Sequence, residues 1–215
     1  MSDVERKTAG VPTLKRLPLY LRLLRTMQEE GNEYASGAVV ARELGLDPIV
    51  VRKDLAITGA VGRPRLGFQM DEIIIAIEEF LGWSNTSDAI LVGVGNLGTA
   101  LLGYQGFEQH GMRIVAAFDS NPAIVGKTIH GKTILDFSEL PTLARRMHVQ
   151  IGVMTVTASV AQKVADSMIE GGIRGIWNFT PATLTVPEHV ILQREDLASS
   201  LAVLSHRLLI DKSLE

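Results

Sequence analysis

The stretch Ala89–Gly98 limits what this chain can fold into more than any other stretch. A short apolar run leads into the pattern Gly-x-Gly-x-x-Gly, formed by Gly93, Gly95 and Gly98, and a helical pattern follows. This order is typical of the start of a dinucleotide-binding unit. The first glycine permits a tight turn, the second lets the backbone approach a pyrophosphate, and the third lets the helix pack closely on the strand. The helix then presents free N–H groups and the positive end of its dipole to the phosphates.

An acidic residue supports this interpretation. A second apolar run, Ile114–Phe118, follows at the distance that a crossover helix requires, and it ends in Asp119. Asp119 comes about 20 residues after the last glycine, where a carboxylate accepts hydrogen bonds from an adenosine ribose. The same carboxylate repels a 2′-phosphate, which favours NAD(H) over NADP(H). The alternative is a strand-to-helix turn that binds no ligand, with Asp119 as a helix cap.

The composition narrows the class of protein. The chain has 215 residues, which suits one large domain or two small ones. It contains no cysteine, so disulfides and thiol chemistry are excluded. The first ten residues are polar and charged, unlike a secretory signal, and no segment is long and apolar enough to cross a membrane. We therefore expect a soluble cytoplasmic protein with no membrane partner.

Charge is distributed unevenly along the chain. Residues 1–69 carry a formal net charge of +3, whereas the remainder carries −6. A basic N-terminal region followed by an acidic remainder predicts that the N-terminal region binds a polyanion. Neither the five histidines nor any other side chains have metal-ligand spacing, so we expect no metal site.

The basic N-terminal region has the pattern of a helix-turn-helix. Ser36 can cap a short helix that ends at Gly45, and Asp47 can cap the next helix, which carries Arg52 and Lys53. A tight glycine turn between two short helices is typical of this DNA-binding motif. The alternative is that the two cations belong to a solvated helix face.

The segment Gly59–Phe68 extends the pattern to a winged helix. Glycines at both ends and the arginines Arg63 and Arg65 near its tip predict a β-hairpin. Arginine on a slender loop suits the narrow, negative minor groove of A·T-rich DNA. The alternative is a charged loop that keeps the protein soluble.

Further elements complete the expected fold. We expect a helix over 13–30, with Pro18 in its first turn or at a kink. The apolar segment 71–81 is expected to close the first domain, and we place a domain boundary in the polar turn that follows. Beyond Asp119 we expect a hairpin over 125–134, a helix capped by Ser138, strands over 149–156, 173–178 and 190–192, and a helix over 158–170. Strands that alternate with helices predict an α/β domain with a parallel sheet. The predicted domains are 1–84, 85–195 and 196–215.

The last segment, 196–210, is a predicted helix with one leucine stripe. A stripe this apolar requires a partner surface, which is either the protein's own sheet or a second subunit. A winged helix reads a two-fold site as a dimer, which favours the second subunit.

Taken together, these residues resemble one family, Rex, the bacterial redox-sensing transcriptional repressors. The resemblance extends from about Pro12 to Leu209. It rests on Val51–Leu55, Gly62–Arg63 with Gly67–Phe68, the glycine pattern, Phe118–Asp119, Gly172–Ile176 and Trp177–Pro181.

The resemblance implies a homodimer in which each subunit has an N-terminal winged helix, a Rossmann-type domain and a terminal helix swapped between subunits. It implies binding to operator DNA, here expected to be an A·T-rich palindrome. NADH would release the protein from DNA, and NAD⁺ would compete while leaving the DNA-binding form intact. Both nucleotides would therefore act as effectors, and the protein would have no catalytic residues.

The resemblance also assigns roles by position. The expected nucleotide contacts are Gly93, Gly95, Asn96, Leu97, Gly98 and Asp119, with Thr155, Val156, Thr157, Asn178, Phe179 and Pro181 around the nicotinamide. The expected DNA contacts are Arg16, Arg52, Lys53, Arg63 and Arg65. A redox-dependent hydrogen-bond network across the dimer is expected from Arg22, Tyr104 and Asp196. Without the resemblance, these last three would be a surface charge, a half-buried ring and a helix cap.

The sequence departs from the family pattern at a few positions. Members often have proline where Thr157 stands and aromatic residues where Ile57 and Thr58 stand, and some have an aromatic residue where Leu197 stands. These differences bear on nucleotide affinity and operator preference.

The competing hypothesis is an NAD-dependent dehydrogenase with a basic accessory domain. Such an enzyme requires a proton donor or acceptor beside the nicotinamide. None of the five histidines lies in a recognisable catalytic motif. His206, for example, lies among the leucines of the terminal helix.

Overall fold

The structure is a computed structural model that describes residues 8–211. The chain divides into two compact units, one up to Asn85 and one from Thr86 onward. Across residues 8–211, no helix combines the length and the apolar character that crossing a membrane requires.

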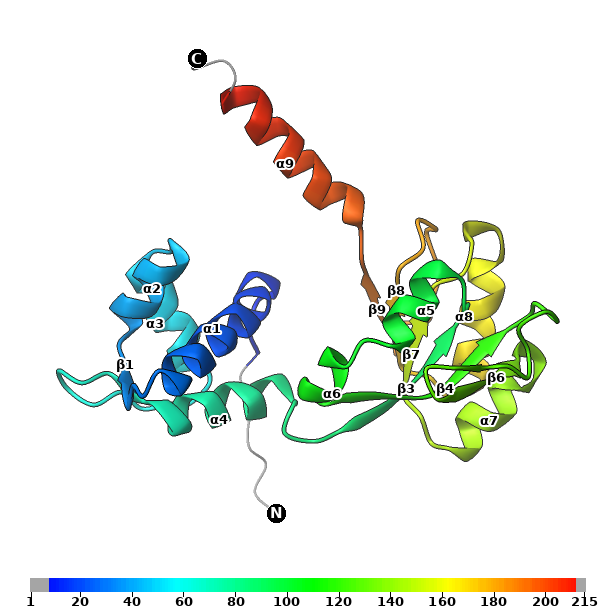
Figure 1. The fold of residues 1–215 in the computed structure, drawn as a ribbon, viewed down its shortest axis with the longest axis horizontal. Helices are drawn as coiled ribbons and strands as arrows, with labels where there is room; N and C mark the ends of the chain where they lie inside the picture. Colours follow the sequence, from blue (N-terminus) through cyan, green and yellow to red (C-terminus); the bar gives the residue numbers. More distant parts are fainter. Residues whose placement is uncertain (1–7, 212–215) are drawn as a thin grey trace. The chain divides into compact units, whose positions relative to one another are not determined.

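From residue 8 onward, the first unit consists of four helices and a two-stranded sheet (Figure 1). The helices are α1 (Val11–Glu29), α2 (Gly37–Leu44), α3 (Pro48–Ile57) and α4 (Met70–Leu81), and the strands are β1 (Tyr34–Ala35) and β2 (Phe68–Gln69). One apolar core holds them together, and its fully buried members include Leu17, Leu24, Val51, Leu55 and Ile73.

The predicted caps of the helix-turn-helix are confirmed. The Ser36 hydroxyl accepts a hydrogen bond from the Val39 N–H at 3.2 Å, and the Asp47 carboxylate accepts one from the Ile49 N–H at 2.6 Å. Gly45 ends α2 in the left-handed conformation, at φ +64°. These contacts are local in sequence, which is why the residue pattern predicts them.

Helix α1 begins two residues earlier than predicted and continues through Pro18. A proline within a helix leaves the carbonyl four residues earlier without its usual donor. That carbonyl belongs to Leu14, which is exposed, so water can hydrate it. The helix therefore tolerates the proline.

The predicted hairpin over 59–68 is corrected by the structure. Its pairing is reduced to a single antiparallel bridge between Arg63 and Gly67. The next residue, Phe68, pairs with Ala35 from β1, which comes before the helix-turn-helix. Gly67 has φ +96°, and a side chain there would overlap the Ala35 carbonyl oxygen. The wing is therefore a loop whose base is paired with β1.

The second unit is built on a seven-stranded sheet. Its strands are β3 (Ser87–Val92), β4 (Met112–Asp119), β5 (Thr128–Ile129), β6 (Lys132–Asp136), β7 (Ile151–Met154), β8 (Gly175–Asn178) and β9 (Ile191–Arg194). They lie in the order β5-β6-β4-β3-β7-β8-β9, and every neighbouring pair is parallel except β5 with β6. The chain runs outward from β3 to one side and then, from β7, to the other. This reversal between β3 and β7 is the topological switch point of a Rossmann fold.

Helices cover both faces of this sheet (Figure 1). The helices that pack on it are α5 (Asn96–Leu102), α6 (Gly106–Gln109), α7 (Leu140–Arg146) and α8 (Ala161–Glu170), with short 3₁₀ turns η1 (Phe137–Glu139) and η2 (Ala158–Val160). The unit also contains α9 (Leu197–Asp211), which belongs to neither of the two cores. Helices α7 and α8 pack on the face of Ile90 and Phe118, whereas Leu102 of α5 packs on the face of Leu91. Side chains of a strand alternate between faces, so each central strand contributes to both cores.

One predicted cap in this unit is wrong. Ser138 does not cap the helix after β6. Instead, the Asp136 carboxylate accepts hydrogen bonds from the backbone N–H and the hydroxyl of Ser138, and η1 then leads into α7. The hydrogen bonds from Ser138 lower the pKa of the Asp136 carboxyl.

Candidate functional site

The glycine loop lies at the switch point between β3 and β7. Gly93 has φ +96°, and a Cβ atom there would come within 2.7 Å of Val156 Cγ1. A Cβ atom at Gly98 would overlap the carbonyl oxygen of Gly93, because the first turn of α5 lies directly on the loop. Both glycines are therefore required by packing, as the spacing predicts.

Gly95 differs from its two neighbours in the motif. A Cβ atom at this position would meet no atom of residues 8–211 within 4 Å. Packing within the described chain therefore does not require a glycine here. Its carbonyl oxygen accepts a hydrogen bond from Thr99 N–H, the first of α5, so Gly95 is the N-cap residue of that helix. Asn96 and Leu97 form the exposed first turn. This is the geometry that lets a phosphate reach backbone N–H groups.

Thr155, at the end of β7, holds the loop from the neighbouring strand. Its hydroxyl lies 2.6 Å from the Gly93 carbonyl oxygen and 3.2 Å from that of Val92. Its backbone N–H donates to the Val92 carbonyl at 3.0 Å. The two strand ends that flank the switch point are thus joined by side-chain and backbone hydrogen bonds.

Asp119, at the end of β4, faces the same loop. One carboxylate oxygen accepts a hydrogen bond from Val94 N–H at 2.7 Å, and the other accepts one from Asn121 N–H at 2.8 Å. A carboxylate has about four lone-pair positions, so acceptor capacity remains for ribose hydroxyls. Asp119 both supports the loop and occupies the position expected of a ribose ligand.

A cavity of about 110 Å³ adjoins Asp119. Phe137, Val156 and Val160 give it apolar walls, and Lys163 of α8 places a cation at its edge. Apolar walls of this kind suit a purine ring. The residue pattern did not predict a role for Phe137, Val160 and Lys163. Their only signal is that each follows the carboxyl end of a parallel strand.

The segments expected around the nicotinamide follow β7 and β8. A dinucleotide bound at the switch point places its second half beside the strands beyond the reversal, which here are β7 and β8. Val156 is half-buried, and Thr157 and Pro181 are exposed. Phe179 is half-buried, with its ring centroid 4.9 Å from that of Trp177.

Asn178 forms side-chain hydrogen bonds within its own segment. Its side chain is fully buried, its amide oxygen accepts from Thr180 N–H at 2.9 Å, and its amide N–H₂ donates to the Ala182 carbonyl at 3.4 Å. The side chain therefore holds the turn after β8. The amide retains a second N–H and a second oxygen lone pair, and its contact with a nucleotide stays a prediction.

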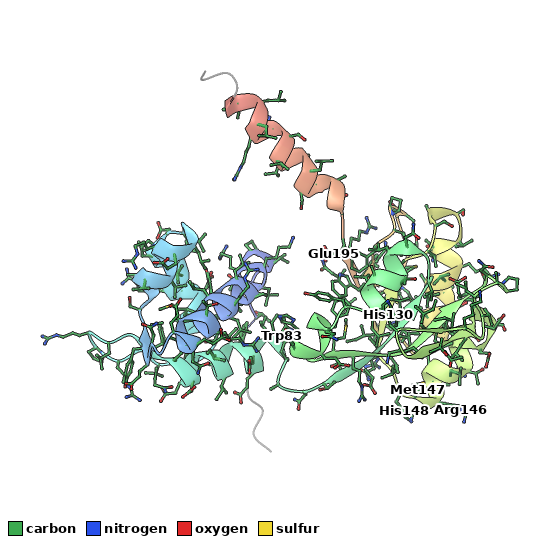
Figure 2. The ribbon with its side chains drawn as sticks, in the orientation of Figure 1. Trp83, His130, Arg146, Met147, His148 and Glu195 are labelled. Atoms are coloured by element: carbon green, nitrogen blue, oxygen red, sulfur yellow. The ribbon has the colours of Figure 1, made fainter. Side chains whose placement is uncertain are left out.

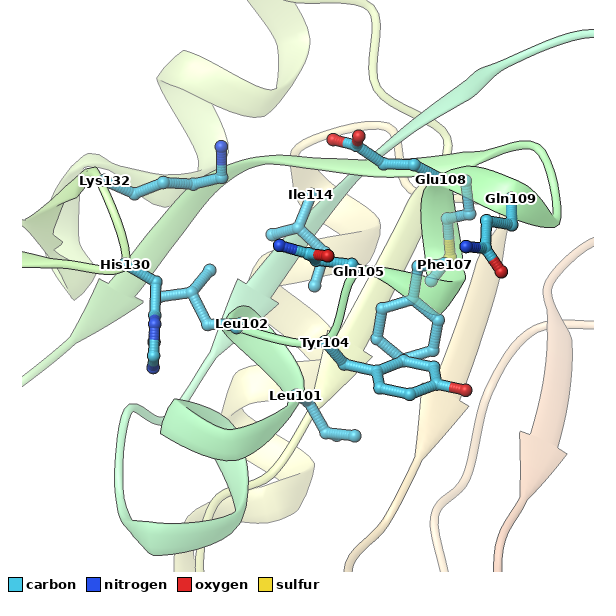
Figure 3. Close-up of a pocket in the computed structure, with 12 residues that line it drawn as sticks. Leu101, Leu102, Tyr104, Gln105, Phe107, Glu108, Gln109, Ile114, His130 and Lys132 are labelled. Atoms are coloured by element: carbon cyan, nitrogen blue, oxygen red, sulfur yellow. The ribbon is translucent and has the colours of Figure 1, made fainter.

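A second cavity, of about 530 Å³, is shown in Figure 3. Its lining includes Tyr104, Phe107, His130 and Lys132, and it reaches the start of β4 at Met112. The glycine loop lies at the opposite, carboxyl ends of the strands. Tyr104 is 55% exposed, and its ring contacts the Phe107 ring edge-on with centroids 4.9 Å apart.

The three residues of the expected redox network lie in both units. Arg22 is exposed on α1 of the first unit, whereas Tyr104 and Asp196 belong to the second. Asp196 caps α9 by accepting hydrogen bonds from the Ser199 hydroxyl at 2.8 Å and Ala198 N–H at 2.9 Å, which lower its pKa. The network itself stays a prediction.

The recognition helix of the expected DNA-binding unit is α3. Arg52 and Lys53 are exposed on it, and neither forms an ion pair with another described residue. The Arg52 stem packs on α2, where a Cβ atom at Gly37 would lie 3.0 Å from its Cγ. The side chain is therefore supported at its base while its charged end stays available.

Arg16, which is half-buried, forms an ion pair within this unit. Its guanidinium donates two hydrogen bonds to Asp54 of α3, at 2.6 and 2.9 Å, and the Tyr20 hydroxyl donates a third at 2.7 Å. Asp54 is only 4% exposed. In this geometry Arg16 joins α1 to α3, and its predicted contact with DNA stays a prediction.

The electrostatics of this group follow from burial and pairing. Burial alone would raise the pKa of the Asp54 carboxyl, but the hydrogen bonds from Arg16, Tyr20 and Thr13 outweigh it and hold that pKa below its ordinary value. Burial, together with the adjacent Asp54, raises the pKa of Tyr20 to about 12. The hydrogen bond to Asp54 raises the pKa of Arg16. At neutral pH the group is thus a charged pair capped by a neutral phenol.

The two arginines of the wing also differ. The Arg63 guanidinium donates to the Tyr34 hydroxyl at 2.8 Å and to Glu72 at 3.1 Å, and it lies 5.5 Å from the centre of the Tyr34 ring. Arg65 is exposed at φ +66° and forms no ion pair within the described part of the chain. Arg63 braces the base of the wing, and Arg65 is the cation that the loop presents.

No group of three or more histidine, aspartate or glutamate side chains within residues 8–211 is arranged to hold a metal ion.

Comparison with known proteins gives consistent results for both units. Residues 10–56 match the family described as the putative DNA-binding protein N-terminus, and residues 84–182 match the CoA binding domain family. Redox-sensing transcriptional repressor Rex of Treponema denticola is 46% identical over 93% of this chain and 95% of its own length. Rex of Bacteroides fragilis is 41% identical over 92% of this chain and 90% of its own length.

Solved structures of RSP, described as a Rex-family repressor, resemble the whole chain. The complex of RSP with β-NAD⁺ and operator DNA matches with a TM-score of 0.89 and 30% identity, over 96% of this chain and 95% of that one. The complex with β-NADH matches with a TM-score of 0.86 and 30% identity, over 96% of this chain and 99% of that one.

Proposed function

The chain belongs to the Rex family of redox-sensing transcriptional repressors, and we propose that it binds operator DNA as a homodimer and leaves that DNA when it binds NADH. The glycine loop at the switch point carries this proposal. Packing requires Gly93 and Gly98 as glycines, whereas Gly95 has no such requirement, so a pyrophosphate is the reason for its lack of a side chain. The RSP complexes with β-NAD⁺ and β-NADH support nucleotide binding by this family.

The nucleotide acts as an effector in this proposal. Asp119 and the 110 Å³ cavity hold the adenosine, and the nicotinamide reaches the residues after β7 and β8. NADH and NAD⁺ differ by one charge at the nicotinamide ring, so the two conformations of the protein must bind them with unequal free energy. No hydride is transferred to a substrate, and incubation of the protein with NADH and small ketones or acids is expected to leave the NADH absorbance unchanged. Such a repressor works in the cytoplasm, where its operator and the nucleotide pool lie.

The homodimer is inferred from α9. Along this 15-residue helix, Leu201, Leu204 and Leu208 are between 53% and 62% exposed. An isolated helix of this length is marginal in water, and its stability normally comes from burying an apolar face. We assign that face to a second copy of this chain, with α9 exchanged between subunits. Tyr104, which is also exposed, would then belong to the redox network with Arg22 and Asp196.

The DNA contacts are assigned to three cations, Arg52, Lys53 and Arg65, which we call the DNA-binding surface. Arg52 and Lys53 extend from α3 toward a major groove, and Arg65 extends from the wing toward the minor groove. Arg16 and Arg63 support the DNA-binding surface indirectly, because Arg16 holds α3 and Arg63 holds the base of the wing. Two copies of α3 in a dimer favour a palindromic, A·T-rich site.

The decisive experiment is binding to a short A·T-rich palindromic duplex with NADH, with NAD⁺ or with neither. Tight binding that NADH abolishes and NAD⁺ does not is the expected result. Binding that ignores both nucleotides would refute the redox response. A protein that binds NADH but no such DNA at modest salt would refute the repressor function and favour the dehydrogenase hypothesis.

The DNA-binding surface has its own test. Arg52→Ala and Lys53→Ala are each expected to weaken operator binding by about 1–3 kcal/mol if the side chain reads a base edge. NADH binding, measured by calorimetry, should remain at the wild-type level. An unchanged operator affinity in either variant would remove that residue from the surface.

A further inference from the structure

Four aromatic rings form a continuous chain of contacts through the second unit. The Tyr104 and Phe107 rings meet edge-on with centroids 4.9 Å apart, a contact visible in Figure 3. Phe107 contacts Trp177 at 5.6 Å, and Trp177 contacts Phe179 at 4.9 Å. The chain begins at an exposed tyrosine beside the 530 Å³ cavity and ends in the segment after β8, beside which the second half of a dinucleotide would lie.

Trp177 is the branch point of this chain. Its indole N–H donates a hydrogen bond to the Glu195 carboxylate at 2.9 Å. Glu195 follows β9 directly and lies two residues before the start of α9 (Figure 2). Its backbone N–H donates to the Asn178 carbonyl at 2.9 Å, and the next residue, Asp196, caps α9.

Trp177 therefore touches three segments that have separate tasks. Through Phe179 it contacts the turn after β8, through Phe107 it reaches Tyr104, and through Glu195 it holds the start of α9. Packed rings cannot be compressed, so a ring that moves must displace its neighbour. A phenylalanine would keep an aromatic ring at this position but could not donate a hydrogen bond to Glu195.

We propose that Trp177 is a positioning residue for the redox response, which couples the occupancy of the nicotinamide end of the site to the start of α9 through its hydrogen bond to Glu195. This inference rests on the proposed function. A bound nicotinamide sets the position of Phe179, Phe179 sets the tilt of the indole, and the indole N–H sets the position of Glu195. The direction of α9 follows, because its cap is the residue after Glu195. Phe107 and Tyr104 move with the indole on its other side.

The test separates coupling from binding. Trp177→Phe keeps an aromatic ring but removes the N–H donor, and Glu195→Ala removes the acceptor. Glu195→Gln is the matched control, because its amide still offers an acceptor oxygen at the same reach. For each variant, three quantities are measured: the Kd for NADH by calorimetry, the operator Kd without nucleotide, and the operator Kd at saturating NADH. The ratio of the two operator values is the coupling factor.

Trp177→Phe and Glu195→Ala are expected to lower the coupling factor at least about fivefold, a large share of typical coupling. Their affinity for NADH and their affinity for the operator without nucleotide should each change less than about threefold. The substitutions would then alter the coupling between the two ligands without altering the binding of either ligand alone. Glu195→Gln should retain the wild-type factor. Thermal unfolding confirms that each variant is folded.

Two results would overturn the inference. One is a wild-type coupling factor in a folded Trp177→Phe protein. The other is a loss in which NADH affinity falls as much as coupling, because that would make Trp177 a simple wall of the site. A wild-type protein that binds operator but ignores NADH would refute the proposed function as well, so the two failures are distinguishable.

Discussion

The glycine loop of the second unit and the wing of the first are both glycine-rich turns for which the sequence predicts ligand contacts. In the loop, the candidate contacts are backbone N–H groups, and their arrangement follows from glycines two to five residues apart. In the wing, the candidate contacts are side chains, and one of the two arginines is held by Tyr34 and Glu72. The comparison shows that a site built from backbone can be located from local sequence, whereas one built from side chains depends on distant partners.

The largest expected effect is that of Gly98→Ala in the glycine loop. Gly98→Ala places a methyl group against the Gly93 carbonyl oxygen, so the helix or the loop must move. We expect a loss of about 3 kcal/mol of unfolding free energy and no measurable NADH binding. Calorimetric unfolding and NADH titration provide the measurements.

Gly95→Ala is the matched control for that variant. Its methyl group meets no described atom of the protein, so unfolding should match the wild type. NADH affinity should fall at least about tenfold, because the methyl group blocks the approach of a phosphate. If Gly95→Ala binds NADH normally, the loop does not hold a pyrophosphate at this point.

The next effect concerns the group that supports the recognition helix. Asp54→Asn leaves Arg16 without its anionic partner in a buried position and is expected to cost about 3 kcal/mol. Operator affinity should fall with it, because α3 loses its connection to α1, while NADH binding in the other unit stays unchanged. Thermal unfolding and operator titration of the full chain test this. Normal stability would show that the Arg16–Asp54 pair does not fix α3.

The same group predicts a pH dependence with a definite sign. The pKa of the Asp54 carboxyl is lowered in the folded state. Its contribution to the free energy of unfolding is therefore present above the ordinary value of 3.8 and is lost as the pH falls through the lowered pKa. The pKa of Tyr20 is raised from 10.0 to about 12, so its contribution is complete below pH 10 and is lost as the pH rises through 12. The free energies of unfolding of the wild type and of Asp54→Asn should therefore become more similar at acidic pH. A constant difference down to pH 2 would contradict the assignment.

The smallest effects distinguish the two wing arginines. Arg65→Ala should reduce operator affinity and lower the slope of log affinity against log salt by about one, the mark of one lost phosphate contact. Arg63→Ala should instead lower unfolding stability by about 1 kcal/mol or less, because its ion pair with Glu72 is exposed. Equal salt slopes for the two variants would mean that the wing presents both arginines to DNA.

Much of the fold follows from the sequence through short-range signals. Ser36, Gly45 and Asp47 set the bounds of α2 and α3 through contacts with backbone two to four residues away. The wing is the exception among the turns. Its strand β2 pairs with β1, more than thirty residues earlier, and no local pattern shows that partner.

By itself, the sequence determined the parallel sheet, the position of the glycine loop, the acid at the end of β4 and the helix-turn-helix, because periodicity, glycine spacing and caps act over one or two turns of chain. Only the tertiary structure decided which cations are free. Arg16 meets Asp54 at a separation of 38 residues, Arg63 meets Tyr34 at 29, and Trp177 meets Glu195 at 18. A guanidinium or an indole N–H is satisfied by whichever acceptor the packed chain places within reach, and that acceptor leaves no mark on the residues beside it in the sequence.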